Sequence, residues 1–491
     1  MTKINLTSGD SQPRSSLASN QRRLNVYAEA VDPKTGEPTQ MIHYPTPGLR
    51  KIASMPNLQP CRCLYRASNG DLYAASGHDI YYIDPKFKFK RIGALTNSGQ
   101  MNPVKMADNG IDVVICDGTA VNGWAVNMIS REELRPLYDP TASDELTVSS
   151  TGWLGSRYLD FSDGFIIANS LGTPSFYVSN PENVIFDSTQ FAAKTSYPDP
   201  IVAAIVQHRV IWLIGEVSSE VWYNTGNAFP FELMPGVAID YGCMAPYSIV
   251  KAETSVYFLG QTQYGEPMVL QGTGYSVKRV STHPFEHILS SYDDITDCVA
   301  YVYMEEGHTF YVMTLPSADV TWVFDLATGQ FHQRAWIDTD GVEHRHRGLM
   351  HAHVYDMNIV SDWETANLYE LDINSFTDNG DPIKRLVTFS RQIDNEDANR
   401  LMFRSFTAEF DVGETRLPND NPLATLSWSE DKGNSWSNGL GQTLGKMGGY
   451  DTKIIWRRLG LSESRTFRLE WQANAMTSLT AAFLDVVKAT S

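Results

Sequence analysis

Five histidines form the group of residues best suited to bind a metal ion: His332, His344, His346, His351 and His353. Two pairs among them are two residues apart, and side chains at that spacing share one face of a β-strand, so each pair could chelate a metal. No cysteine or carboxylate lies at a complementary short spacing. Histidines on the surface or between subunits are the alternative, and we predict neither a bound metal nor another cofactor.

A second chemically suggestive group runs from Ser429 to Trp436 and matches the Asp-box pattern S-x-D-x-G-x-x-W. Asp boxes occur in sialidases, which would favour a glycosidase. The same pattern describes a hairpin in which Asp431 accepts hydrogen bonds from turn amides, Gly433 takes a positive φ and Trp436 packs behind the turn. Because the chain holds one copy, in its C-terminal part, we predict a structural turn.

No motif selects a pair of catalytic carboxylates. Glycoside hydrolysis needs two carboxyl groups about 5 Å apart or somewhat more. Nucleophile-elbow, zinc-protease, P-loop and dinucleotide-binding patterns are absent from the sequence. Asp293, Asp294 and Asp297 could hold a divalent ion, but carboxylates at a helix end are more often simply solvated. We predict no catalytic residues and no enzyme, with a glycosidase acting on host surface polysaccharide as the alternative.

Composition limits the partners and the compartment. The net charge of −18 argues against a basic surface that grips nucleic acid, although an acidic wall could let DNA slide past. An odd, sparse set of cysteines indicates a reducing compartment rather than a disulfide framework: Cys61, Cys63, Cys116, Cys243 and Cys298. Met1 to Gln12 is polar and no apolar run of about eighteen residues occurs, so we predict neither a signal peptide nor a membrane span.

The elements that must position these residues are clearest between His308 and Trp336. Branched and aromatic residues fill three strand segments there, and Thr328-Gly329 marks a tight hairpin between the last two. Six weaker copies of this unit of about forty residues occur along the chain, which makes seven units in all. Such sheets must stack on their neighbours around a ring, so we predict an all-β fold with a β-propeller of six to eight blades, with Trp322 and Phe324 packed against adjacent blades. Two tandem sandwiches are the alternative.

The sequence divides into three predicted parts. Residues 1–44 are expected to be an N-terminal arm and a ring-closing strand, in which Leu24 to Tyr44 joins the last blade. Residues 45–390 are expected to be the propeller, interrupted by one packing helix from Pro284 to Tyr292. Residues 391–491 begin with a polar linker and are expected to form a small C-terminal β-sandwich, because their strands lack the propeller spacing.

Several motifs, taken in order, resemble a known family: Leu24 to Glu29, Tyr44 to Leu49, Glu286 to Tyr292, Thr321 to Asp325, Asn367 to Asp372, Ile455 to Gly460 and Phe467 to Glu470. The chain is similar in this order, over nearly its whole length, to the packaged-DNA stabilisation protein, or tail nozzle, of short-tailed bacteriophages. The cluster from His344 to His353 lies outside the pattern, and the family has no catalytic residues to transfer.

The resemblance implies a structural virion protein that assembles as a homohexamer below the dodecameric adaptor that caps the portal. It implies that the protein helps to retain packaged DNA, carries tailspikes or tail fibres, and forms part of the ejection conduit, which DNA passes without sequence-specific binding. The expected location is the virion tail, after assembly in the host bacterial cytoplasm. A carbohydrate-binding propeller would need equivalent aromatic pockets in several blades, and the repeats vary too much for that.

Overall fold

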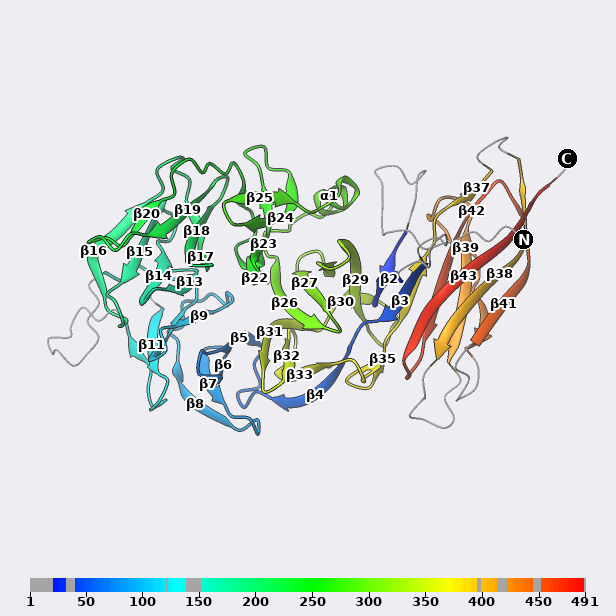
Figure 1. The fold of residues 1–491 in the computed structure, drawn as a ribbon. Coiled ribbons are helices and arrows are strands. Elements are labelled where there is room, and N and C mark those ends of the chain that lie inside the picture. The colour runs from blue at the N-terminus through cyan, green and yellow to red at the C-terminus, as the bar shows by residue number, and fades with distance from the viewer. Residues whose placement is uncertain are drawn as a thin grey trace.

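The computed structural model describes residues 21–31, 40–120, 122–137, 152–394, 399–412, 422–444 and 452–489. These residues form β-strands with one α-helix, α1 (His283–Ser290), and one 3-10 helix, η1 (Pro246–Ser248). None of their helices is long and apolar enough to cross a membrane. A ring of sheets lies beside a two-layered sandwich (Figure 1). The predicted N-terminal arm falls almost wholly outside the described residues.

Four sheets have the same build, four antiparallel strands in sequence order. The second strand of a blade carries apolar or small side chains on both faces, because it packs against both neighbouring blades; β6 and β10, for example, are buried at every position. The strands are β5 (Cys61–Arg66), β6 (Leu72–Ser76), β7 (Asp79–Ile83), β8 (Phe89–Ala94), β9 (Lys105–Asp108), β10 (Asp112–Cys116), β11 (Gly123–Asn127), β12 (Arg135–Pro136), β13 (Leu159–Ser162), β14 (Phe165–Asn169), β15 (Ser175–Ser179), β16 (Phe186–Ala193), β17 (Ile201–Gln207), β18 (Val210–Gly215), β19 (Ser219–Asn224) and β20 (Phe231–Leu233).

The fifth and sixth blades depart from this pattern at their edges. In the fifth blade, β21 and β22 both pair with β23. The sixth blade contains the stretch from His308 to Trp336 and gains an extra short strand, β30, on β29. Their strands are β21 (Gly242–Cys243), β22 (Val250–Ala252), β23 (Ser255–Gln261), β24 (Pro267–Thr273), β25 (Ser276–Arg279), β26 (Val299–Glu305), β27 (His308–Leu315), β28 (Val320–Asp325), β29 (Gln330–Ile337) and β30 (Glu343–Arg345).

A strand from near the N-terminus closes the ring. The seventh blade has three strands from late in the chain, β31 (Gly348–Val354), β32 (Met357–Asp362) and β33 (Asn367–Asp372), and β4 (Gly48–Ser54) pairs antiparallel with β33 as the fourth. Our prediction that Leu24 to Tyr44 joins the last blade is therefore wrong. Closure begins at Gly48, where a Cβ would lie 2.5 Å from the Ser375 carbonyl oxygen. The described residues thus form seven blades, within the predicted six to eight.

The sandwich takes its strands from both ends of the chain. One layer is β2 (Val26–Val31), β3 (Gln40–Pro45), β43 (Thr477–Lys488), β38 (Leu401–Val412) and β41 (Thr452–Ser462). The other contains β36 (Arg385–Thr388), β42 (Ser464–Gln472), β39 (Leu423–Ser429) and β40 (Leu440–Thr443), with β37 (Gln392–Ile393) on β42. Val26, Val387 and Phe389 lie in its core. The sandwich therefore includes strands that we had placed in the ring-closing segment and the propeller, and it begins before residue 391.

Aromatic side chains hold the sixth blade to its neighbours. Phe324 packs against Tyr257 of the fifth blade, with ring centroids 6.4 Å apart. Trp322 meets Phe285 of α1 edge-on at 5.1 Å, and Phe285 also stacks on Phe331 at 3.9 Å. These contacts confirm that Trp322 and Phe324 are interblade core residues and that the helix near Pro284 is a packing helix.

A charge introduced at Phe324 should prevent folding of the ring. Phe324→Asp would place an unpaired carboxylate at a site that is 5% exposed, and we expect a loss of about 4 kcal/mol or more in the free energy of unfolding. Phe324→Leu keeps the site apolar and should lose only about 1 kcal/mol. Solubility and thermal melting check both variants; a Phe324→Asp protein that melts like the wild type would contradict the packing of blades five and six.

Candidate functional site at the propeller–sandwich joint

The five cysteines offer no reactive thiol. All are free and buried. Burial raises the pKa of Cys61, Cys63 and Cys243 to about 12, and raises the pKa of Cys116 and Cys298 as well. A thiol that stays protonated neither attacks substrates nor binds metals, so these side chains act as small apolar groups in the blades.

The Asp-box residues form the hairpin that the pattern predicts. Asp431 accepts a hydrogen bond from the Ser435 amide at 2.8 Å, and the Gly433 amide donates to Ser429 Oγ at 2.7 Å. Gly433 has φ +96°, and the Arg468 guanidinium lies 4.2 Å from the centre of the Trp436 ring. Hydrogen bonds from the Ser435 hydroxyl, the Ser435 amide and the Ser429 hydroxyl lower the pKa of Asp431 to about 2, so its carboxylate stabilises the turn.

The histidines do not converge on a point. His346 is buried and accepts a hydrogen bond from the Gly348 amide, while His351 and His353 both contact Asn358 Oδ1. His344 meets two carboxylates on opposite sides of its ring: Nδ1 is 2.7 Å from Asp319 Oδ2 and Nε2 is 3.2 Å from Asp338 Oδ2. No group of three His, Cys, Asp or Glu side chains in the described residues could hold a metal ion.

The three aspartates at the helix end are likewise separate. Asp294 accepts hydrogen bonds from the amide and hydroxyl of Thr296, and Asp297 accepts one from the Ser317 amide at 2.7 Å. These contacts fix the loop between α1 and β26.

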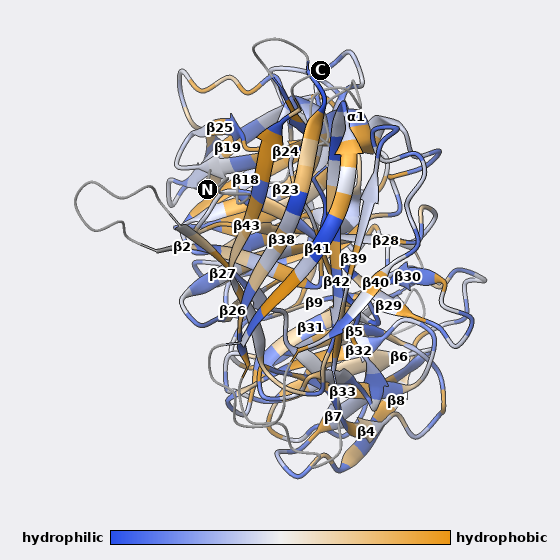
Figure 2. Ribbon diagram, turned by 90° about the vertical axis from the view of Figure 1, so that its right-hand side faces the viewer, coloured by the Kyte–Doolittle hydropathy of each residue, from blue (hydrophilic) through white to orange (hydrophobic). Residues whose placement is uncertain are grey.

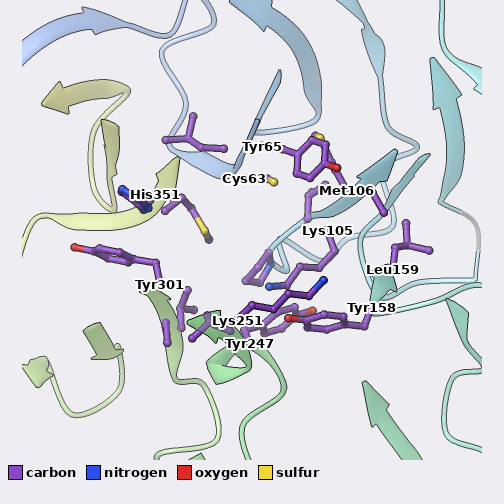
Figure 3. Close-up of a pocket in the computed structure, with 18 of the residues that line it drawn as sticks. Cys63, Tyr65, Lys105, Met106, Tyr158, Leu159, Tyr247, Lys251, Tyr301 and His351 are labelled. Carbon is purple, nitrogen blue, oxygen red and sulfur yellow. The ribbon is translucent and has the colours of Figure 1, made fainter. Parts of the chain in front are cut away.

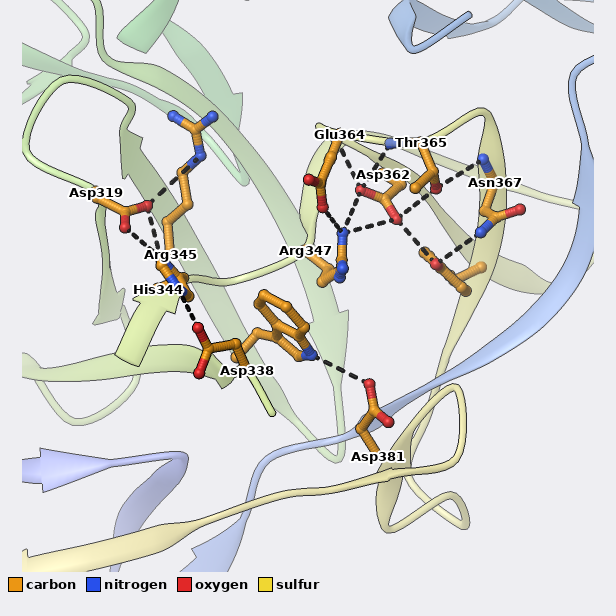
Figure 4. A network of polar contacts seen from close by, with 12 residues as sticks. Asp319, Asp338, His344, Arg345, Arg347, Asp362, Glu364, Thr365, Asn367 and Asp381 are labelled. Carbon is orange, nitrogen blue, oxygen red and sulfur yellow. Dashed lines mark hydrogen bonds and ion pairs between the residues drawn. The ribbon is translucent and has the colours of Figure 1, made fainter. Parts of the chain in front are cut away.

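A polar network joins blades six and seven (Figure 4). The Arg347 guanidinium lies 4.0 Å from the centre of the Trp336 ring and pairs with Asp362 at 3.3 Å and Glu364 at 2.7 Å. Trp336 Nε1 donates to Asp381 at 3.3 Å. Asp381 belongs to β35 (Asp381–Pro382), which pairs with β34 (Thr377–Asp378) beside β4. The network therefore reaches from the sixth blade to the start of the connection to the sandwich.

A single sheet runs through that connection. The short strand β1 (Arg23–Leu24) pairs parallel with β29 of the sixth blade, Leu24 opposite Gln333, and antiparallel with β36 of the sandwich. Because β36 then pairs with β42, eleven strands form one hydrogen-bonded sheet from the propeller into the sandwich. This is the joint: β1, its two neighbours and the side chains around them.

Asn25 fastens the joint with every polar group of its side chain. Its Nδ2 donates to the Ala335 carbonyl at 2.9 Å and to the Lys384 carbonyl at 2.8 Å, and its Oδ1 accepts from the Ala335 amide at 3.0 Å. Its backbone amide donates to the Gln333 carbonyl at 2.8 Å. Asn25 has φ +54°, a conformation that Asn tolerates better than most residues. It is 2% exposed, so these contacts replace water completely.

A chain of five charged side chains crosses the outside of the joint. Glu343 of β30 pairs with Arg22 at 2.6 Å and with Lys384 at 3.2 Å. Lys384 also pairs with Glu470 at 3.6 Å, and Glu470 with Arg468 at 2.8 Å. Burial would raise the pKa of Glu343, but Arg22 and Lys384 hold it below its usual value. Partly exposed ion pairs contribute about 0–1 kcal/mol each, so these five charged side chains orient the two domains more than they stabilise them.

Charged groups also lie inside the joint. Arg385 of β36 donates through Nη1 to the Ala473 carbonyl at 3.1 Å, while its Nε and Nη2 have no partner among the described residues. Arg334 of β29 donates to the Tyr303 hydroxyl. Burial raises the pKa of Asp378 to about 7, although both arginines act to lower it. Such groups favour one arrangement of the surrounding backbone, since a displacement that separates them from their partners would leave buried charges without compensation.

Sequence reasoning missed the joint. Leu24 and Asn25 belong to one of the family motifs, but their contacts with Gln333 and Ala335 span more than 300 residues of chain, about 310 in the case of Ala335. The signal that could have revealed the joint is Asn25, a polar residue suited to positive φ, between the apolar strand residues Leu24 and Val26.

Replacement of Asn25 by Ala should loosen the joint. The variant leaves two buried carbonyls and one buried amide unsatisfied and imposes positive φ on Ala, which together should lower the free energy of unfolding by about 2–4 kcal/mol. Hydrogen exchange should quicken in β1 and β36 and stay slow in β6 and β10. Asn57→Ala, which removes an amide with a bond to the Ser76 carbonyl within the first blade, is the matched control. Unchanged exchange in β36 would contradict the role of Asn25.

Buried histidines should make the protein sensitive to acid. Burial lowers the pKa of His346 to about 3. Between that value and the ordinary pKa of 6.5, His346 is protonated in the unfolded chain but neutral in the folded one. The free energy of unfolding therefore falls as pH falls through this range. The stability difference between wild type and His346→Asn should therefore shrink by about 2 kcal/mol between pH 7 and pH 5. Chemical denaturation at each pH measures it. His353→Asn, at an exposed site, is the control; parallel curves for wild type and His346→Asn would refute the assignment.

Comparison with known proteins gives two matches to family models. The model described as the β-propeller of bacteriophage P22 Gp10 matches residues 2–376, and the model described as its β-sandwich matches residues 387–487. The division between them falls beside β36, where the structure also begins the C-terminal part of the sandwich. No curated protein matches.

Solved structures show weaker likenesses. An extracellular domain of a hybrid two-component system from B. thetaiotaomicron is 9% identical with a TM-score of 0.41, over 75% of this chain and 44% of that one. The N-terminal domain of Nup159 is 10% identical with a TM-score of 0.36, over 71% of this chain and 98% of that one. The chain spans 44% and 62% of the first two structures. On the two family-model matches, which together cover nearly all of it, the chain belongs to the bacteriophage P22 Gp10 family of packaged-DNA stabilisation proteins.

Proposed function

We propose that this chain is the tail-nozzle subunit of a short-tailed phage. In this proposal it assembles as a homohexamer beneath the portal adaptor, helps to retain packaged DNA, carries tailspikes or tail fibres, and forms part of the conduit for ejection. The observation that carries the proposal is the unbroken sheet through β1, which makes the propeller and the sandwich one mechanical unit. A subunit with such a joint can pass load between partners held at its two ends.

The outer face of the sandwich offers a surface for self-assembly. Met402 of β38 lies opposite Leu461 of β41 on one side and Val487 of β43 on the other. The three side chains are 42%, 40% and 38% exposed, so an apolar row crosses the sheet. Figure 2 views this face, on which β43, β38 and β41 run side by side. A row of this kind beside polar residues is typical of a protein contact.

The charge of the chain supports a conduit for DNA. At −18, the protein lacks the excess of Lys and Arg with which proteins neutralise phosphates and hold nucleic acid. A conduit through which DNA is ejected quickly should have a lumen wall that does not bind the DNA.

Assembly tests the proposal. Wild-type chain mixed with the portal–adaptor complex of its phage should form a closed ring of six on the adaptor, seen by native mass spectrometry and electron microscopy. Met402→Glu should fold normally but fail to form the ring, because six carboxylates would enter apolar contacts. Ile129→Glu, at an 86% exposed position on the propeller, is the matched control. A wild-type chain that stays monomeric and never joins a tail would refute the nozzle; ring formation by Met402→Glu would refute only this contact.

A further inference from the structure

A cavity of about 410 Å³ lies on the axis of the propeller. All seven blades contribute to its wall, through β5, β9, β13, β17, β22, β26 and β31. At about 30 Å³ for each water molecule, the space exceeds a dozen waters, so a small solute fits with part of its hydration shell. Figure 3 shows Lys105, Lys251, Tyr158 and Tyr247 gathered on one side of it, across from Tyr301 and His351.

Lys105 enters this cavity without a counter-ion. Its ammonium lies 4.6 Å from the centre of the Tyr158 ring, and the Tyr158 hydroxyl donates to the Ile249 carbonyl at 2.7 Å, which fixes that ring. No carboxylate oxygen of the described residues lies within 4.0 Å of the ammonium. Burial lowers the pKa of Lys105. The cation–π contact compensates only in part for the loss of water.

The carboxylates of the cavity wall are already engaged. Asp160 accepts from the Lys251 ammonium at 2.5 Å and from the amides of Val206 at 2.6 Å and Phe161 at 2.9 Å. Asp108 accepts from the Tyr65 hydroxyl at 2.7 Å and from the Ser68 amide at 3.0 Å. These contacts hold both carboxylates away from Lys105, so Asp160 acts on the Lys105 ammonium only from beyond 4.0 Å and compensates its positive charge only in part.

Two further features suit an anion. The Tyr247 hydroxyl is buried and has no hydrogen-bond partner among the described residues, which leaves a donor free. The thiol of Cys63, also in the wall, stays protonated because burial raises its pKa to about 12. The cavity therefore holds an ammonium without a close counter-ion and a free hydroxyl, while the two carboxylates in its wall are engaged by other donors.

We propose that the axial cavity binds a small oxyanion, such as phosphate, a phosphate monoester or a carboxylate, against the Lys105 ammonium, with the Tyr247 hydroxyl as a second donor. The anion would link the second blade, which carries Lys105, to the fifth, which carries Tyr247 and Lys251. Bound there, it would stabilise the closed ring by mass action, because the unfolded chain lacks the site.

Calorimetry on the purified full chain tests the site. Inorganic phosphate, acetate and chloride are titrated separately at constant ionic strength. We expect saturable binding of one phosphate or acetate per chain, a rise in melting temperature with the same anion, and weaker binding of chloride, which is monatomic and cannot place a separate acceptor atom against each donor. Lys105→Met should weaken binding at least tenfold and Tyr247→Phe several-fold. Lys278→Met, at an exposed position of the same ring, should bind as the wild type does.

A second variant keeps the test decisive if Lys105→Met does not fold. Asp160→Asn releases the Lys251 ammonium and removes a negative charge, so it should tighten binding, opposite in sign to Lys105→Met. Absence of saturable binding to the wild type, equal affinity in Lys105→Met, or unchanged or weaker affinity in Asp160→Asn would overturn the proposal. Chloride binding as tight as that of phosphate would overturn the assignment of an oxyanion.

Discussion

The two residues of β1 form the hydrogen bonds on which the arrangement of the whole molecule depends. They lie between β29 of the propeller and β36 of the sandwich: Leu24 pairs with both strands, and Arg23 pairs with β36. A sheet resists bending in its plane because each backbone bond is reinforced by the next along the strand. Two residues are few for this task, and the side chain of Asn25 extends the contact with three more hydrogen bonds.

The chain topology makes this contact possible. The N-terminal segment passes first through the joint, then through the sandwich as β2 and β3, and then into the ring as β4, which closes it. Closure of the propeller and attachment of the sandwich thus use one continuous stretch of chain. Loss of order in that stretch would open the ring and release the sandwich together, which couples the stability of the two domains.

The blades could be predicted because their patterns are local. Strand pairings between distant parts of the chain could not be predicted from the sequence. Phe324 and Trp322 stand on strands whose alternation and turns are visible within thirty residues, and their core positions were predicted. The strand that closes the ring was not predicted correctly. Leu24 to Tyr44 and Gly48 to Ser54 both look extended, and which of them closes the ring depends on pairing with β33, more than 300 residues away.

The histidines show the same limit on a smaller scale. The spacing rule placed His351 and His353 on one face of β31, and both do reach Asn358. It failed for His344 and His346, because β30 ends at Arg345 and the chain turns inward before His346, which becomes buried. Period-two reasoning holds only while the strand continues.

Distances between the propeller and the sandwich test the central claim most directly. The native cysteines are buried, so cysteines introduced at Lys278 of β25 and Arg457 of β41, both exposed, can be spin-labelled selectively. Pulsed electron paramagnetic resonance should then give one narrow distance distribution, the same for the isolated chain and for labelled chain diluted into an excess of unlabelled subunits in the assembled tail. A broad or multiple distribution in the isolated chain would contradict the claim that the sheet through β1 makes the two domains one unit.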